Sequence, residues 1–208
     1  MKLDSIGFDL DGTLWNSIEG VCVSWNEAIS EYPEIEKELS YEDIKGCMGL
    51  VIKEIGEKLF PDLDEAIRID LMRECCEREE SYLEEHGGEL FSMLEETLKV
   101  LSKKYKLYIV SNCQRGYIEC FFRAHRLGEY FVDIECSGNT GLSKGENIKA
   151  VMERNNFKNS IYLGDTKGDF EGAKLAGIPF VYARYGFGDV EGYDYVIDKF
   201  EDILKIVE

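Results

Sequence analysis

The chain is poor in basic residues, histidine and proline, and each shortage excludes a class of function. Its 208 residues include 24 Lys and Arg against 42 Asp and Glu, a formal net charge of -18. Because nucleic acids and anionic membranes bind through clustered cations, neither is an expected partner. Only two histidines occur, both distant from the N-terminal acids, so a histidine-based zinc site is not expected. Three prolines and no low-complexity tract indicate an ordered globular protein.

Long apolar runs are also missing. No segment is long enough to span a bilayer, and the N-terminus reaches Asp4 and Asp9 without the apolar core of a signal peptide. The seven cysteines are odd in number and form no C-x-x-C pair, which favours reduced thiols that pack as small hydrophobic side chains. We therefore expect a cytoplasmic protein.

Short apolar runs alternate with amphipathic stretches over most of the chain. The runs, which suit strands buried on both faces, are 3–8, 107–110, 131–134, 161–163, 180–182 and 195–197. The later runs are separated or followed by helical patterns at 94–104, 115–126, 144–155, 168–176 and 200–207. Strand–helix alternation predicts an α/β fold, a Rossmann-like parallel sheet with helices on both faces.

One long segment departs from this alternation and has helical patterns throughout. Ser17 is expected to cap its first helix, and Ser40 with Asp43 resembles a capping box. Its acidic end, 77–89, is interpreted as a solvated face. We expect two parts. Residues 1–14 and 90–208 form the α/β core, and residues 15–89 form an inserted helical cap.

Two carboxylates follow the first predicted strand. Asp9 and Asp11 lie two residues apart at the end of that strand and point roughly the same way, and Gly12 permits a sharp turn directly after them. Such a pair is costly unless a cation lies between the acids or one of them holds a proton. This pattern favours a hard divalent metal, and we interpret it as a Mg²⁺-assisted phosphoryl-transfer site.

A second pair of acids follows the strand predicted at 161–163. Asp165 would lie at the tip of that strand, and Asp169 one helical turn further on. Taken alone, both acids are better explained as a helix cap and a first-turn acid. Two parallel strands that both end in acids favour a site instead, because ligands of parallel sheets bind at the carboxyl ends of the strands.

Three further residues are candidates for binding phosphate. Ser111 and Asn112 end a buried strand and can donate hydrogen bonds to phosphate oxygens, although a helix-capping role explains Ser111 equally well. Lys144 follows a glycine-containing loop and can bring a positive charge to an anionic centre. In isolation, most such lysines are surface residues.

The motifs resemble those of one known family. The segment Asp9-Leu10-Asp11-Gly12-Thr13-Leu14 resembles motif I of the haloacid dehalogenase superfamily, and Ser111, Lys144 and the segment 164–169 resemble its motifs II, III and IV. They occur in the family's order, and the resemblance covers essentially the whole chain. The insert at 15–89 is similar to the helical C1-type cap of phosphoglycolate phosphatases.

The resemblance implies the roles of the acids. Asp9 would be the nucleophile that forms an aspartyl-phosphate, and Asp11 would be the general acid and base. Mg²⁺ would be held by the carboxylates of Asp9 and Asp165 and by the backbone carbonyl of Asp11. Asp169 would support the site through water or a hydrogen bond to Lys144.

The resemblance also implies a substrate class. Ser111 and Lys144 would hold the phosphoryl oxygens, and the second acid of motif I, Asp11, favours phosphate esters. The expected activity is hydrolysis of a small phosphorylated metabolite, with phosphoglycolate as the default of the family. A mutase is not expected, because the family's mutases carry a histidine soon after motif I and none occurs here before His86.

Several alternatives remain open. Nucleotides, sugar phosphates and pyrophosphate are also possible substrates, because the cap selects the leaving group and the segment Trp15-Asn16-Ser17 departs from the family's usual sequence. A non-catalytic regulatory protein would keep the fold but is expected to lose at least one acid. Cys113 lies beside the proposed site, and we interpret it as a lining residue rather than a nucleophile.

Overall fold

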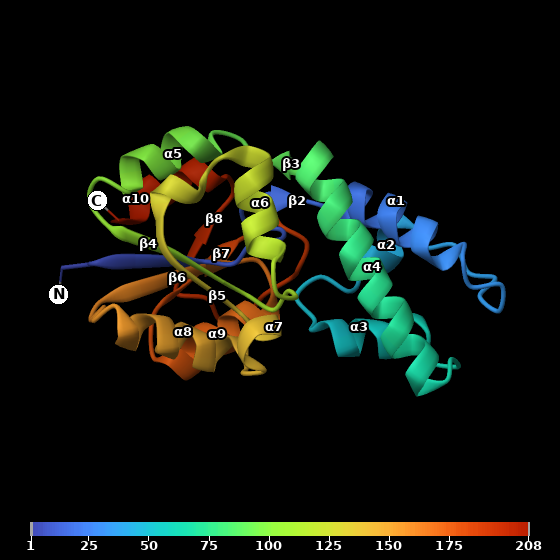
Figure 1. Cartoon of the computed structure of the whole chain (residues 1–208). Helices are drawn as coiled ribbons and strands as arrows, with labels where there is room; N and C mark the ends of the chain where they lie inside the picture. Colours follow the sequence, from blue (N-terminus) through green and yellow to red (C-terminus); the bar gives the residue numbers. More distant parts are fainter. Residues whose placement is uncertain (1, 208) are drawn as a thin grey trace.

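A six-stranded parallel sheet forms the centre of the computed structural model, which describes residues 2–207 (Figure 1). The strands lie side by side in the order β5-β4-β1-β6-β7-β8, and every pairing is parallel. The strands are β1 (Ser5–Phe8), β4 (Lys106–Ser111), β5 (Phe131–Cys136), β6 (Ser160–Gly164), β7 (Phe180–Ala183) and β8 (Tyr195–Ile197).

Helices cover both faces of this sheet, as Figure 1 shows. One face carries α5 (Leu94–Leu101), α6 (Tyr117–His125) and α10 (Ile203–Val207). The other carries α7 (Ser137–Thr140), α8 (Lys144–Arg154) and α9 (Lys167–Ala176). Two short 3₁₀ turns occur at Gly128–Tyr130 and Phe200–Asp202. The predicted α/β fold is confirmed.

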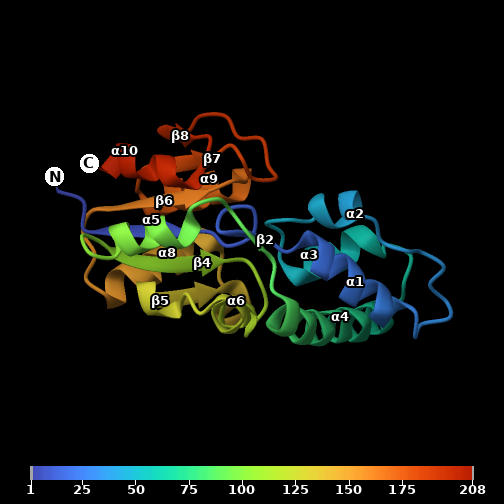
Figure 2. The same cartoon turned by 90° about the horizontal axis from the view of Figure 1, so that it is seen from above.

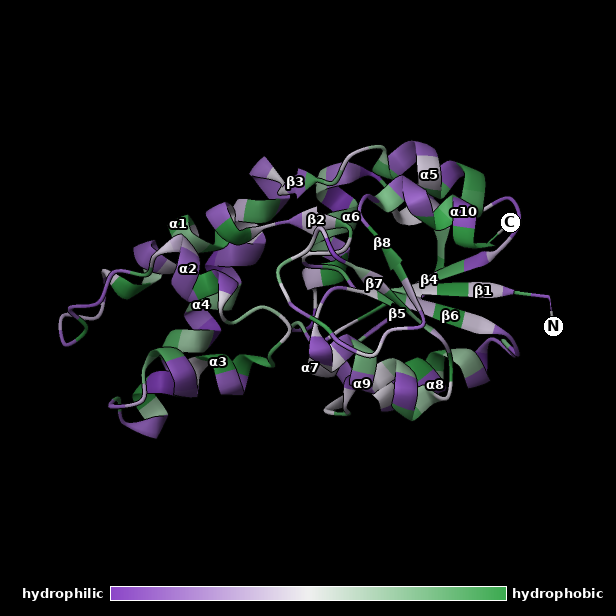
Figure 3. Ribbon diagram, turned by 180° about the vertical axis from the view of Figure 1, so that it is seen from behind, coloured by the Kyte–Doolittle hydropathy of each residue, from purple (hydrophilic) through white to green (hydrophobic). Residues whose placement is uncertain are grey.

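The apolar sequence of β1 follows from its central position. All four of its residues are buried, and the hydropathy colouring of Figure 3 shows apolar residues along the central strands. Ile6 and Phe8 pack into one core cluster. On the opposite face, Gly7 leaves room for the Tyr108 ring, because a Cβ at Gly7 would lie 2.5 Å from that ring. A central strand covered on both sides therefore has no polar face to show in its sequence.

The segment after β1 forms a block of helices beside the carboxyl ends of the strands (Figure 2). Its helices are α1 (Ile18–Ile29), α2 (Tyr41–Lys45), α3 (Ile52–Leu59) and α4 (Glu65–His86). Its two ends pair as the short antiparallel strands β2 (Trp15–Asn16) and β3 (Glu89–Leu90), which the sequence did not predict. The division into a core and a cap at these boundaries stays a prediction. Within residues 2–207, no helix combines the length and apolar character that crossing a membrane would require.

Two expectations about this helical block fail in part, since Ser17 takes the N-cap position without capping and the stretch 77–89 has exposed acids at Glu77, Glu84, Glu85 and Glu89 but not at Glu79. Ser17 lies at the N-cap position of α1 but makes no side-chain capping bond, because its hydroxyl donates to Asp11 Oδ1 at 2.7 Å. Glu79 belongs to the acidic stretch that was expected to be solvated, yet it is 5 % exposed. It lies one turn from Cys75 and Leu83 on the buried face of α4. The capping box of Ser40 and Asp43, by contrast, is present.

Candidate active site

The candidate residues lie at the carboxyl ends of three neighbouring strands. Strand β1 pairs with β4 on one side and with β6 on the other. Asp9 follows β1, Ser111 ends β4 and Asp165 follows β6. The order of strands therefore brings these three side chains to one edge of the sheet, where parallel sheets bind ligands.

A glycine turn allows the chain to leave β1 close to Asp165. Gly12 has a φ of 79°, in the left-handed region that favours glycine. A Cβ at Gly12 would lie 2.2 Å from Asp165 Oδ2. This position therefore needs glycine both for its backbone conformation and for the space that the Asp165 carboxylate occupies.

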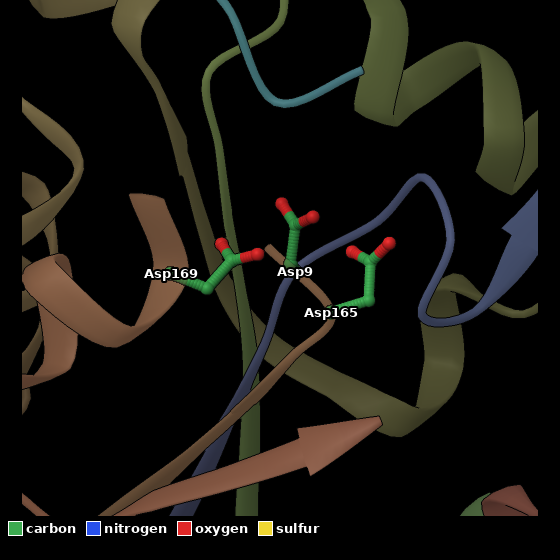
Figure 4. A group of neighbouring side chains, drawn as sticks. All are labelled: Asp9, Asp165 and Asp169. Atoms are coloured by element: carbon green, nitrogen blue, oxygen red, sulfur yellow. The ribbon is translucent and has the colours of Figure 1, made fainter. Parts of the chain in front are cut away.

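Three buried carboxylates converge beyond this turn. One oxygen each from Asp9, Asp165 and Asp169 lies within 4.8 Å of the others, and Figure 4 shows the three side chains turned towards a shared space. Asp165 Oδ2 accepts a hydrogen bond from the Phe187 N–H at 2.7 Å. Its other oxygen, Oδ1, is buried and has no hydrogen-bond partner among residues 2–207. A buried oxygen without a partner, inside a set of hard oxygen ligands, fits a divalent cation such as Mg²⁺.

Lys144 lies against two of these acids. Its Nζ donates to Asp9 Oδ1 at 2.8 Å and also to Asp169 Oδ1, so the hydrogen bond expected between Lys144 and Asp169 is present. The ammonium is buried. Burial opposes its charge, but the carboxylates of Asp169 and Asp9 outweigh that effect and raise the pKa of Lys144.

One lysine does not balance three acids, and their pKa values reflect this. Burial and the charge of Asp169 raise the pKa of Asp9 to about 7, although Lys144 acts in the opposite direction. Burial, followed by the charges of Asp169 and Asp9, raises the pKa of Asp165 well above its ordinary value. The cluster therefore holds an excess of negative charge that a bound cation would relieve.

Asp11 lies in a different environment from the other acids. Its Oδ1 accepts hydrogen bonds from Trp15 Nε1 at 2.8 Å, Ser17 Oγ at 2.7 Å and the Tyr117 hydroxyl at 2.9 Å. Burial raises its pKa, and the hydrogen bonds from Ser17, Tyr117 and Trp15 partly offset this. Asp11 is thus held in one orientation. Because its pKa is raised, it keeps its proton to a higher pH than an exposed aspartic acid does.

The two polar residues after β4 differ in their contacts. Ser111 is buried, and its hydroxyl accepts a hydrogen bond from the Cys113 N–H at 3.3 Å. The Asn112 side chain donates to the Gly49 carbonyl at 2.8 Å and accepts from the Ser137 hydroxyl at 3.0 Å. Asn112 therefore links the helical block to the core, and its role in phosphate binding stays a prediction. Burial raises the pKa of the Cys113 thiol well above its usual range, which agrees with a lining role.

A cavity of about 60 Å³ lies between these acids and the helical block. Asp9, Asp11 and Ser111 line it from the core, and Trp25 and Glu79 line it from α1 and α4. The site thus combines a carboxylate beside a buried lysine, a second oriented carboxyl, an acid cluster suited to a cation, and a cavity that can receive an organic group.

The family model for haloacid dehalogenase-like hydrolases matches residues 6–183, from β1 to the end of β7. The chain belongs to this family. The resemblance of the motifs to haloacid dehalogenase hydrolases is therefore confirmed, and the chain is a hydrolase of this family.

Two curated relatives match along nearly their whole length. A phosphoglycolate phosphatase from Vibrio parahaemolyticus is 27 % identical, over 97 % of this chain and 95 % of the relative. A pyrophosphatase from Bacillus mycoides is also 27 % identical, over 100 % of this chain and 98 % of the relative. Relatives with different substrates at equal identity indicate the class of chemistry better than the substrate.

Solved structures of the family share the fold. A predicted phosphoglycolate phosphatase from Haemophilus somnus superposes with a TM-score of 0.85 at 22 % identity, over 100 % of this chain and 99 % of that one. A haloacid dehalogenase-like family hydrolase from Streptococcus pneumoniae gives a TM-score of 0.80 at 24 % identity, over 99 % of both chains. At this level of identity the likeness concerns the fold alone.

Tyr117 and Glu79 are among the residues of this hydrolase site that the sequence did not predict. Tyr117 donates to Asp11 although 106 residues separate them, and its position in an amphipathic helix gives no sign of this contact. Glu79 was hidden in a run of acids. The available signal was its spacing of four residues from Cys75 and Leu83, which places it on the apolar face of a helix.

Proposed function

We propose that the chain is a Mg²⁺-dependent phosphatase that hydrolyses a small phosphomonoester through an aspartyl-phosphate. The observation that carries this proposal is the convergence of Asp9, Asp165 and Asp169 around a buried lysine. Curated relatives named as phosphatases support it. Phosphoglycolate is the first reference substrate, because it is in the name of one of these relatives.

In the first step, Asp9 attacks phosphorus. A bond forms between an Asp9 carboxylate oxygen and phosphorus while the bond from phosphorus to the ester oxygen breaks. Lys144 and Ser111 hold the phosphoryl oxygens, and the lysine reduces the repulsion between the attacking carboxylate and the phosphate. Asp11 donates its proton to the departing oxygen, which leaves as an alcohol.

In the second step, Asp11 acts in reverse. Its carboxylate accepts a proton from a water molecule, and the water oxygen attacks phosphorus. The bond to Asp9 breaks, inorganic phosphate leaves, and both acids return to their starting states. The hydrogen bonds from Trp15, Ser17 and Tyr117 keep the Asp11 carboxyl in one orientation for both transfers.

The donor set also supports the proposed cofactor. Asp9, Asp165 and the Asp11 carbonyl would hold Mg²⁺, and Asp169 would position Lys144. When bound, Mg²⁺ supplies positive charge that offsets the charge of the phosphoryl group. Two observations support a cation here: Asp165 Oδ1 has no hydrogen-bond partner within residues 2–207, and the pKa values of Asp9 and Asp165 are raised.

We also propose that residues 15–89 act as a cap over a core of residues 1–14 and 90–208. The support is that α1 and α4 contribute Trp25 and Glu79 to the wall of the cavity. In this arrangement the core performs the chemistry, and the helical block surrounds the leaving group.

Phosphate release from p-nitrophenyl phosphate, with Mg²⁺ and with EDTA, tests this function. We expect turnover that depends on Mg²⁺ and falls to background in EDTA. A folded protein that releases no phosphate from this ester or from a broad panel of phosphorylated metabolites would instead be a non-catalytic member of the family. The same panel would rank phosphoglycolate against nucleotides, sugar phosphates and pyrophosphate.

A further inference from the structure

Glu79 is a buried acid that the proposed reaction does not use. It comes from α4, is 5 % exposed and lines the same cavity as Asp9 and Asp11. Its Oε2 accepts hydrogen bonds from Trp25 Nε1 at 2.9 Å and from Gln114 Nε2 at 3.4 Å. Within residues 2–207, the structure gives its other oxygen, Oε1, no hydrogen-bond partner. A carboxyl at a cavity wall with one oxygen uncommitted can accept a hydrogen bond from a ligand.

The strongly ionisable side chains that line this cavity are all acids. Asp9, Asp11 and Glu79 line it, and none of the described residues that line it is a lysine, arginine or histidine. The buried Lys144 is engaged with Asp9 and Asp169 at the other side of the acids. A carboxylate on the leaving group would therefore lie among acids, whereas an ammonium group would favour the ionised form of Glu79 and so oppose the burial that raises its pKa to about 8.

The remaining lining from the helical block is apolar or aromatic. Ile44, Met48 and Ile52 contribute aliphatic surface, and Trp25 turns the N–H edge of its indole to Glu79. A carboxylate in apolar surroundings is a favourable partner for an ammonium group, through a charge-assisted hydrogen bond.

We propose that Glu79 is a specificity residue that binds an ammonium group on the leaving group, so that the substrate is a small amino-alcohol phosphate. This inference rests on the proposed phosphatase function and narrows it. Glu79 Oε1 accepts hydrogen bonds from the ammonium, while Asp9 attacks phosphorus at the other end of the substrate. Carboxylate-bearing esters such as phosphoglycolate are correspondingly poor substrates.

Four esters of nearly equal length test the preference. They are 2-aminoethyl phosphate, 2-hydroxyethyl phosphate, ethyl phosphate and phosphoglycolate, which differ in whether the group at the far end is ammonium, hydroxyl, methyl or carboxylate. We expect kcat/KM for 2-aminoethyl phosphate to exceed that for 2-hydroxyethyl phosphate by roughly tenfold, the scale of one charge-assisted hydrogen bond. Phosphoglycolate should be the slowest of the four.

The variant Glu79→Gln tests whether this residue causes the preference. It keeps the shape of the side chain and an oxygen for Trp25 but removes the charge. We expect the ratio of kcat/KM for 2-aminoethyl over 2-hydroxyethyl phosphate to fall roughly tenfold, and phosphoglycolate to improve relative to ethyl phosphate. Glu85→Gln, the same change at an exposed position of α4, should leave all ratios unchanged.

The outcomes separate the two proposals. If ethyl phosphate is hydrolysed but phosphoglycolate is the best of the four, the inference is overturned while the phosphatase function stands. An unchanged ratio in folded Glu79→Gln also overturns it. If Glu79→Gln does not fold, the order of kcat/KM for the four esters in the wild-type protein tests the inference by itself. If none of the four esters is hydrolysed in Mg²⁺ and p-nitrophenyl phosphate is also stable, the proposed function fails and the inference fails with it.

Discussion

At the scale of single residues, Asp9 carries the proposed chemistry, and Figure 4 shows it between Asp165 and Asp169. We expect Asp9→Asn to lower kcat by at least about 10³-fold, the scale seen when a covalent nucleophile is removed. The amide is nearly isosteric but a poor nucleophile. Phosphate release measures the effect, and circular dichroism checks the fold. Rates near those of the wild type, in protein shown by mass spectrometry to be free of deamidation, would refute the mechanism.

Asp165 offers a test of the metal site that does not depend on turnover. Because a ligand that binds only the folded state stabilises it, Mg²⁺ at about 100 times its Kd should add about 2.7 kcal/mol. For a chain of this length, that stabilisation raises the midpoint of thermal unfolding by about 5–10 °C. We expect Asp165→Asn to lose most of this shift. It should also raise the midpoint of the metal-free protein, because it relieves repulsion with Asp9 and Asp169.

The exposed acid Asp62 provides the matched control for this experiment. Asp62→Asn makes the same chemical change in the helical block, and it should keep the full shift caused by Mg²⁺. An equal shift in Asp165→Asn and in the wild type would show that Asp165 is not a ligand.

At the scale of elements, α4 buries a carboxyl whose ionisation should oppose folding. Burial raises the pKa of Glu79 from 4.5 to about 8. Since the folded value lies above the unfolded one, the stabilising contribution is present below pH 4.5 and is lost as the pH rises through 8. Glutamine does not titrate. The free energy of unfolding of Glu79→Gln should therefore rise relative to that of the wild type between pH 5 and pH 8.5. The limiting slope is about 1.4 kcal/mol per pH unit.

Urea unfolding of the variant and the wild type at several pH values measures this difference in free energy of unfolding. The contributions of the other titrating groups cancel, because both proteins contain them. Glu85→Gln, on the exposed side of α4, should show a difference that does not change with pH. A constant difference for Glu79→Gln would mean that Glu79 is solvated and charged in the folded protein.

The elements themselves were largely predictable from the sequence, for a physical reason. Buried parallel strands have no solvated face, so their apolar runs are visible without any structure. The strands β2 and β3 have two residues each and were missed, because two residues are too few to show a period. Glu79 was misjudged because it stands in a run of acids. Its spacing from Cys75 and Leu83 indicates burial, but no local pattern indicates its partner Trp25, which lies 54 residues away.

In the candidate site, too, some residues could be predicted from the sequence and others could not. Asp9, Asp11 and Asp165 were predictable because each follows an apolar strand, and strand topology brings such ends together. The contact between Tyr117 and Asp11 was not predictable. It depends on how α6 packs against the turn after β1, which no sequence motif records.

At the scale of the whole molecule, the net charge of -18 opposes the approach of anionic substrates. Raising NaCl from about 10 mM to about 150 mM shortens the screening length from about 30 Å to about 8 Å. At fixed, saturating Mg²⁺, we expect kcat/KM for a phosphate ester to rise roughly twofold because repulsion at long range is screened, while kcat stays unchanged. Initial rates across the salt series measure this. A fall in kcat/KM would mean that local cations dominate the encounter.

The pairing of β2 with β3 has a consequence for how such a protein diversifies. Trp15 lies opposite Leu90, and Asn16 lies opposite Glu89, so the chain enters and leaves the helical block at neighbouring points. A segment with adjacent ends can be lengthened, trimmed or exchanged without moving the strands on either side. During evolution, new substrate ranges could then arise by remodelling the intervening seventy or so residues, while the reaction chemistry is inherited intact. Grafting such a block between related enzymes at these two strands is the corresponding route for protein engineering.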